Sequence, residues 1–170
     1  MNAQENELLN IIEEFSKKLP KFPDGRINYT NSNSAPIVSI FVKYKDEFLL
    51  LKRSDKVNVY KGKWNSLTGY LDKPNFIEQI LEEAEEELGF GEKYFLSIHF
   101  GDHYEIFDDK INKKWIIFPV LLELNDKPDI RLNWENSEYK WIKPGELNNF
   151  DIIPDVEEGL KRAVSSKYYE

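Results

Sequence analysis

Apolar residues recur along the chain at two different periods, and the change of period marks the predicted elements. Near the N-terminus they follow a helical spacing with Glu and Lys between them, at Leu8, Ile11, Ile12, Phe15 and Leu19. This pattern predicts an amphipathic helix over residues 5–18 that ends before Pro20, because proline cannot continue a helix. Pro23, Asp24 and Gly25 then predict a turn, and residues 26–30 a short strand.

Short apolar runs bounded by polar turns predict a β-sheet for the middle of the chain. The expected strands cover residues 36–42, 47–53, 67–71, 94–107, 114–124 and 139–142. Lys45 and Asp46 suit a tight hairpin between the first two of these strands. Helical periodicity returns over residues 75–88 and 155–165. Strands, a helix, more strands and a final helix predict an α/β fold in which helices cover a mixed sheet.

Composition narrows the function classes. The chain has 170 residues, 41% of them hydrophobic, and a formal net charge of −8. That length favours one domain with a sizeable core, and the charge disfavours broad binding to nucleic acids or anionic membranes. The absence of cysteine removes disulfides, thiolate metal sites and cysteine nucleophiles. We expect a cytoplasmic protein, because there is no secretory signal and no apolar run of the roughly 20 residues that a membrane helix needs.

The helix predicted over residues 75–88 carries the strongest chemical signal. Placed on a helical wheel, its apolar side chains form one stripe that must face the core: Ile77, Ile80, Leu81, Ala84 and Leu88. Another group lies on the far, solvated side: Glu78, Glu82 and Glu85. Glu83, Glu86 and Glu87 share one edge of the stripe, because spacings of three and four residues fall on one face. Gly89 supplies a helix stop.

Three carboxylates on one edge repel each other, and like charges at these spacings destabilise a helix. A hard divalent cation such as Mg²⁺ would reverse that repulsion, because it prefers oxygen ligands and often bridges to substrate phosphates. The alternative is a solvated acidic face, which is what most charge runs are.

Residues 83–90 read Glu-Ala-Glu-Glu-Glu-Leu-Gly-Phe. This segment matches the second half of the Nudix box, Arg-Glu-U-x-Glu-Glu-x-Gly-U with U bulky and apolar, at every fixed polar position after the Arg and at the Gly. Three flanking segments also resemble the family: residues 49–53, 62–69 and 138–147. The chain therefore resembles the Nudix family over residues 36–163. The resemblance implies a Nudix-type α/β/α sandwich with a mixed β-sheet, as a single domain over residues 1–170 whose first 35 residues add an N-terminal helix and hairpin extension.

The first half of the box departs from the family pattern. Glu82 stands where the family keeps an Arg, and the loop from Gly69 to the helix is one residue shorter. The first Glu of the box has no counterpart, since Pro74 or Asn75 occupies that region. In the family the Arg and the first Glu chiefly support the site, while the later carboxylates hold metal. The metal-holding half therefore survives here and the supporting half does not.

The resemblance implies hydrolysis of a pyrophosphate bond in a small molecule linked to a nucleoside diphosphate, or in a related diphosphate. It also implies Mg²⁺, with Mn²⁺ as a substitute. The implied metal ligands are Glu83, Glu86, Glu87 and a backbone carbonyl near Gly69. One of the glutamates, or an acid from a late loop, would accept a proton from the attacking water. Glu138 is the predicted late acid and Glu135 the second choice.

Other residues have two interpretations each. Lys52 and Arg53 could bind the substrate phosphates or form a solvated strand end. Several aromatic residues could stack on a nucleobase or pack in cores and edges: Trp64, Trp115, Trp134, Tyr104 and Tyr139. His99 and His103 have an even spacing that places both on one side of a regular strand. A metal pair, hydrogen-bonded or surface histidines, and a substrate contact by His103 all fit that spacing.

Two other functions fit parts of the pattern. A non-catalytic Nudix domain that binds a nucleotide-like ligand or a partner is favoured by Glu82 and the missing first Glu. An isoprenoid diphosphate isomerase shares the fold, but the better-known type uses a cysteine, which this chain lacks. The N-terminal segment could cap the sheet or build a homodimer, and an exposed apolar stripe on the helix over residues 5–18 would favour the dimer.

Overall fold

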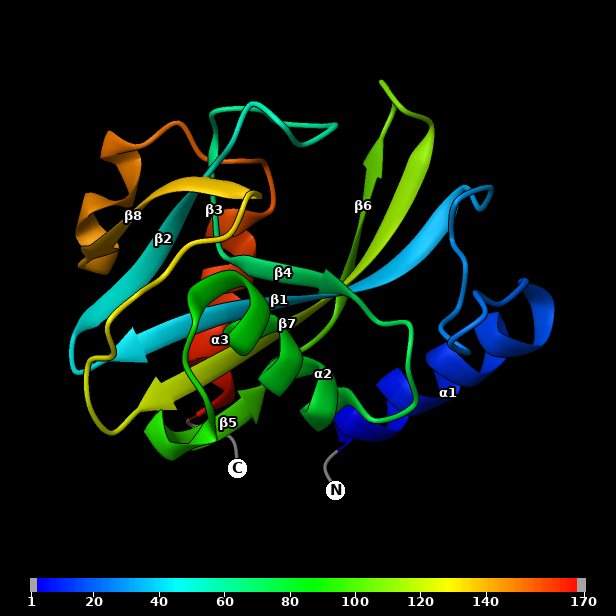
Figure 1. The fold of residues 1–170 in the computed structure, drawn as a ribbon, viewed down its shortest axis with the longest axis horizontal. Coiled ribbons are helices and arrows are strands. Elements are labelled where there is room, and N and C mark those ends of the chain that lie inside the picture. Colours follow the sequence, from blue (N-terminus) through cyan, green and yellow to red (C-terminus); the bar gives the residue numbers. More distant parts are fainter. Residues whose placement is uncertain (1–2, 168–170) are drawn as a thin grey trace.

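The computed structural model describes residues 3–167 (Figure 1). Its helices and strands are α1 (Ala3–Lys18), β1 (Ser34–Tyr44), β2 (Glu47–Arg53), β3 (Trp64–Asn65), β4 (Leu67–Tyr70), α2 (Phe76–Glu83), the π-helical turn η1 (Ala84–Leu88), the 3₁₀ turn η2 (Glu92–Tyr94), β5 (Phe95–Phe100), β6 (Tyr104–Asp108), β7 (Lys113–Leu124), β8 (Asn136–Ile142), the 3₁₀ turn η3 (Pro144–Asn149) and α3 (Val156–Ser166). Within the described range, no helix is long and apolar enough to cross a membrane. The cytoplasmic location stays a prediction.

Eight strands form one mixed sheet. The two long strands β1 and β7 run parallel to each other, and the other strand pairs are antiparallel. The middle of β7 is buried without alternation, because a central strand covered on both faces needs apolar side chains on both sides. Lys45, with a φ of 54°, forms the predicted tight hairpin between β1 and β2.

Helices cover both faces of this sheet. On one face α1 and α2 share an apolar cluster with the inward side chains of β1 and β7. On the other face α3 packs against a second cluster that includes Phe41 and Leu121. Figure 1 shows α2 and α3 on opposite sides of the sheet. The predicted α/β/α sandwich with a mixed sheet is confirmed.

The N-terminal helix packs against the chain's own core. Leu8 and Ile12 are fully buried there, and the remaining apolar side chains of the stripe, Ile11, Phe15 and Leu19, pack against the same cluster. A stripe that is already covered gives no support to the homodimer alternative.

The strand predicted over residues 26–30 does not form. Lys21 and Ile27 make one isolated antiparallel bridge around the predicted turn. Its two hydrogen bonds run from Phe22 N to Arg26 O at 2.8 Å and from Asn28 N to Pro20 O at 2.9 Å, whereas Ile27 N donates to Asp72 O at 3.1 Å. Among the described residues, no further pair extends this bridge into a ladder.

The single strand predicted over residues 94–107 is two strands, β5 and β6. They are separated at Gly101, which lies against the C-terminal half of α3, where an added Cβ would stand 2.4 Å from the Arg162 carbonyl oxygen. His99 Nε2 lies 3.0 Å from Ser97 Oγ, whereas His103 Nδ1 lies 2.9 Å from Gln4 Oε1. The two histidines thus have separate partners, and a metal pair between them is not supported.

The predicted acidic helix forms, with a change of pitch. Asn75 caps its start by accepting a hydrogen bond from Glu78 N at 3.1 Å. The α-helix ends at Glu83 and gives way to the π turn over Ala84–Leu88. Gly89 then ends the segment with a left-handed φ of 77°, as predicted. Such single π turns inside helices are frequent at functional sites.

The predicted buried stripe holds at Ile80, Ala84 and Leu88, whereas Leu81 is only half-buried and Ile77 is exposed. Ile77 is 37% exposed, while Phe76 and Gln79 are buried. The inner row consists of residues spaced four apart: Phe76, Ile80, Ala84 and Leu88. Gln79 is held under the loop that follows β4, because its side chain donates to Tyr70 O and accepts from Asp72 N.

Candidate active site

A cavity of about 520 Å³ opens beside the acidic helix. Its wall is built from α2 and the π turn, β4, the loop after β2, the loop before β8 and the residues before α3. Arg26 of the N-terminal extension also lines it. Ligand pockets commonly enclose about 300–1,000 Å³, so this cavity has room for a nucleotide.

The three predicted carboxylates reach this cavity to different degrees. Glu83 and Glu86 line it, whereas Glu87 lies behind them and is only 4% exposed. Glu87 Oε1 accepts a hydrogen bond from Asn136 Nδ2 at 3.1 Å, and Glu87 Oε2 is buried without a hydrogen-bond partner. Buried carboxylate oxygens are normally satisfied, so this orphan oxygen marks a position where a positive group would be stabilising.

Gly69 is placed directly against Glu83. Gly69 pairs with Val38 across β4 and β1, and α2 brings the Glu83 carboxylate onto it from the side. A Cβ at position 69 would stand 2.1 Å from Glu83 Oε1. Only glycine therefore allows this approach. The residue that the family resemblance proposed for the metal site is in contact with one of the proposed carboxylates.

Burial disfavours the charged forms of these acids. It raises the pKa of Glu83 to about 7. The pKa of Glu87 is raised as well, chiefly by burial and then by the charge of Glu135. Carboxylates with raised pKa values gathered in a cleft are typical of functional sites. Burial therefore favours the protonated forms of Glu83 and Glu87.

The side chains of Lys52 and Arg53 lie in different surroundings. The pairing of β2 with β8 shifts register between them. Arg53 lines the cavity, where its Nε donates to Val59 O at 3.0 Å. Lys52 instead lies opposite Glu138 in the ladder, with Nζ 3.6 Å from Glu138 Oε1. Of the two predicted phosphate contacts, the structure brings only Arg53 to the cavity.

Glu138 is not brought to the cavity either. It is an exposed strand residue paired with Lys52. Glu135, the second choice from the sequence, does line the cavity. The loop that carries it is anchored to Ser54, whose amide donates to Glu135 O at 2.8 Å and whose hydroxyl donates to Trp134 O at 2.7 Å. Glu135 comes just before β8 and so escapes the alternation that turns Glu138 outward.

Only some of the aromatic candidates lie at the cavity. Trp115 and Trp134 line the cavity. Trp64 packs edge-on against Phe150 in the second apolar cluster, and Tyr104 donates its hydroxyl to Asp155 O at 2.9 Å. Tyr139 lies on the exposed part of β8.

Several cavity residues were missed from the sequence: Arg26, Asp72, Gln79 and Asp155. Asp155 is buried with its Oδ2 unpartnered, and burial raises its pKa. Asp72 and Gln79 lie in the half of the box that departs from the family pattern, and Arg26 and Asp155 lie outside the box. Only Gln79 carried a signal in the sequence. It is a polar residue directly before the apolar Ile80, on a helix whose apolar face is turned toward the core.

The geometry can be compared with known proteins. The NUDIX domain family matches residues 33–163. The chain belongs to the Nudix family. The family match supports a Nudix-type pyrophosphohydrolase enzyme, and it encloses both the acidic helix and the loop of Glu135. The sequence-based recognition of the family is confirmed.

Relatives and solved structures agree with this family. The chain is 29% identical over 124 residues to "Nucleoside triphosphatase NudI" of Salmonella agona (strain SL483), covering 68% of this chain and 86% of that protein. A NUDIX hydrolase from Nitrosomonas europaea superimposes with a TM-score of 0.62 at 18% identity, covering 79% of this chain and 90% of that one. A C. elegans Ap4A hydrolase gives a TM-score of 0.60 at 19% identity, covering 80% and 99%. These two structures support the Nudix fold.

Proposed function

We propose that this Nudix domain is a Mg²⁺-dependent hydrolase that cleaves a pyrophosphate bond in a nucleoside triphosphate or in a small molecule linked to a nucleoside diphosphate. Mn²⁺ is expected to substitute for Mg²⁺. The observation that carries the proposal is the convergence of Glu83 and Glu86 on one cavity, with the buried Glu87 behind them and Arg53 on the same wall.

The residues present fit a hard divalent cation. Carboxylate oxygens are the donors that Mg²⁺ prefers. The absence of a Cβ at Gly69 admits the Glu83 carboxylate, and the buried Glu87 Oε2 on the same helix is an oxygen without a hydrogen-bond partner. Across residues 3–167, no three His, Asp or Glu side chains already stand as a finished metal site. We therefore propose that Glu83, Glu86 and Glu87 would hold the cation together, with the backbone near Gly69 as a further donor.

The catalytic roles follow from charge and position. A bound divalent cation would neutralise charge on the phosphoryl oxygens and lower the pKa of a bound water. Arg53 would bind phosphoryl oxygens, since a guanidinium matches phosphate geometry. Glu135 would accept the proton from the attacking water, because it lines the cavity and its charge is felt by both Glu83 and Glu87. Water would attack one phosphorus, and the bridging oxygen would leave with the other phosphate.

The substrate class rests on the relatives and on the cavity. The Salmonella relative is named a nucleoside triphosphatase, and Trp115 and Trp134 offer aromatic faces in the same cavity as the carboxylates. We propose nucleoside triphosphates as the first substrates to test, followed by dinucleoside polyphosphates and nucleotide sugars.

The test is a phosphate- and pyrophosphate-release screen over these three classes, with Mg²⁺, with Mn²⁺ and with EDTA. Turnover that requires the metal supports the proposal. The matched variants are Glu86→Gln, on the cavity wall, and Glu85→Gln, which is exposed on the same turn. Glu86→Gln should lose the activity and Glu85→Gln should keep it. Equal activity in the two variants would contradict the assignment of the metal edge.

A second candidate is a Nudix domain that binds a nucleotide without hydrolysing it. Glu82, in place of the Arg that supports the site in the family, favours this alternative. Nucleotide binding measured by calorimetry, together with no turnover on any of the three substrate classes with either metal, would select it over the hydrolase.

A further inference from the structure

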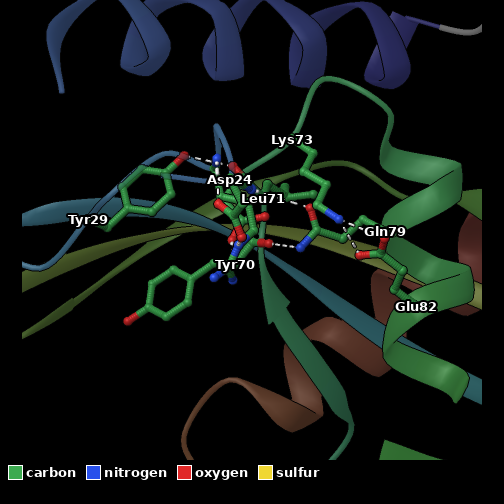
Figure 2. A network of polar contacts seen from close by, with 9 residues as sticks. Asp24, Tyr29, Tyr70, Leu71, Lys73, Gln79 and Glu82 are labelled. Carbon is green, nitrogen blue, oxygen red and sulfur yellow. Dashed lines mark hydrogen bonds and ion pairs between the residues drawn. The ribbon is translucent and has the colours of Figure 1, made fainter. Parts of the chain in front are cut away.

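The loop between Gly69 and α2 is fastened to the helix by an ion pair (Figure 2). Lys73 Nζ donates to Glu82 Oε1 at 2.6 Å and to Glu82 Oε2 at 2.7 Å. Lys73 lies in the loop that follows β4, and Glu82 lies in the last turn of α2. The two side chains are only partly exposed, at 29% and 37%. Glu82 therefore lies not on the fully solvated side that the helical wheel predicts but against the loop.

The same loop is held at each of the three residues before Lys73. Gln79 of α2 donates to Tyr70 O and accepts from Asp72 N at 3.3 Å. Between them, Leu71 O accepts the hydroxyl of Tyr29 at 2.7 Å. Figure 2 shows these contacts as one network that runs from the N-terminal extension, through the loop, to α2. The position of α2 relative to β4 is thus set by side chains on both sides of the loop.

This position decides where Glu83 points. Glu83 follows Glu82 directly, and its carboxylate lies where a Cβ of Gly69 would stand. A shift of α2 along β4 would carry the carboxylate away from Gly69. Partners that orient metal ligands commonly change metal affinity by about 10- to 100-fold when they are removed.

We infer that Lys73 and Glu82 are positioning residues for Glu83, as an ion pair that takes over the supporting role of the missing Arg and first Glu of the Nudix box. The charge at position 82 is negative here and positive in the family. The positive side chain of Lys73, in the shortened loop, compensates for this reversal. Glu82 is then a working part of this site. The metal consequence rests on the proposed function, whereas the placement of Glu83 does not.

The test is a charge exchange with three variants: Lys73→Glu, Glu82→Lys and the double exchange. Each single variant puts like charges together, and the double exchange restores an attractive pair with a positive charge at position 82, as in the family. Mn²⁺ binding and the separate kcat and KM values are measured for each. We expect each single variant to weaken Mn²⁺ binding by about 10-fold and to lower kcat, and the double exchange to recover both.

The matched control is the pair of Glu47 and Lys127. Its N–O distance is 3.1 Å and its exposed fractions, 33% and 36%, are close to those of Lys73 and Glu82, but neither residue lines the cavity. Single charge reversals there should leave Mn²⁺ binding and kcat unchanged. A loss equal to that of the Lys73 and Glu82 variants would show a general electrostatic effect and overturn the inference.

A readout without metal or substrate separates this inference from the proposed function. The amide resonance of Gly69 in the metal-free protein reports the carboxylate packed against it. It should shift in both single variants and return in the double exchange. An unshifted resonance in the single variants, or one that does not return, overturns the inference. If the wild-type protein neither binds Mn²⁺ nor turns over any substrate, the proposed function fails and the Gly69 resonance alone decides the role of the pair.

Discussion

Replacing Gly69 by alanine places a methyl group where the Glu83 carboxylate now lies. The new Cβ would stand 2.1 Å from Glu83 Oε1, and ordinary contact begins at 3.4 Å, so the carboxylate must move by about 1.3 Å (3.4 − 2.1). Displacing a positioned catalytic group by about 1 Å can lower the rate by about 100-fold, which corresponds to about 2.7 kcal/mol of transition-state stabilisation. We therefore expect Gly69→Ala to lower kcat/KM by about 100-fold.

The assay measures Mg²⁺-dependent kcat/KM and Mn²⁺ affinity together with the thermal midpoint. The midpoint should hold or rise slightly, because alanine is favoured over glycine in a strand interior by roughly 0.5–1 kcal/mol and the displaced group is the end of a flexible side chain. Gly91→Ala is the control, since an added Cβ there meets nothing within 4 Å. Wild-type metal affinity and kcat/KM in Gly69→Ala would refute the assigned contact between Gly69 and the metal edge.

Three further predictions test the surroundings of the site. Glu87 has a pKa in the folded state above its ordinary value of 4.5. At pH values between the ordinary and the raised pKa, the folded state binds more protons than the unfolded state. The stability of the metal-free protein should therefore fall as pH rises, by up to about 1.4 kcal/mol per pH unit. Glu87→Gln should flatten that decline in chemical denaturation across pH, and an unchanged slope would refute the buried charge. Tyr29→Phe removes the hydrogen bond to Leu71 O and should cost about 1 kcal/mol in urea unfolding; no loss would mean that the extension does not hold the loop. Ile77→Gln, at a partly exposed position, should change stability by less than about 0.5 kcal/mol, whereas Ile80→Ala should cost about 2–5 kcal/mol, and equal losses would contradict the observed helix face.

The sequence predicted the elements that depend on local periodicity. The hairpin at Lys45, the helix stop at Gly89 and the strands over residues 36–42 and 114–124 all carry their signal within a few residues, and the structure has them. The break at Gly101 was not predictable in this way. It arises because α3, some sixty positions later in the chain, packs its backbone against that glycine.

The same distinction holds for the candidate site. Glu83, Glu86 and Gly69 belong to a contiguous motif and could be placed together from the sequence. Glu135 and Arg26 reach the cavity through loops whose paths are fixed by tertiary hydrogen bonds. The helical wheel assumed a uniform pitch, and it therefore placed Ile77 inward and Glu82 in solvent. In the structure the helix is oriented so that Phe76 is buried, and Lys73 in the preceding loop lies against Glu82.

The most direct test of the metal-dependent site is the Mg²⁺ dependence of phosphate release in two double variants on one helix. Glu86→Gln with Glu87→Gln removes two of the proposed ligands, while Glu78→Gln with Glu85→Gln removes the same charge from exposed positions. We predict that the first double variant loses Mg²⁺-dependent turnover and that the second retains it. Unchanged turnover in the first double variant would contradict the assignment of the acidic edge as the metal site.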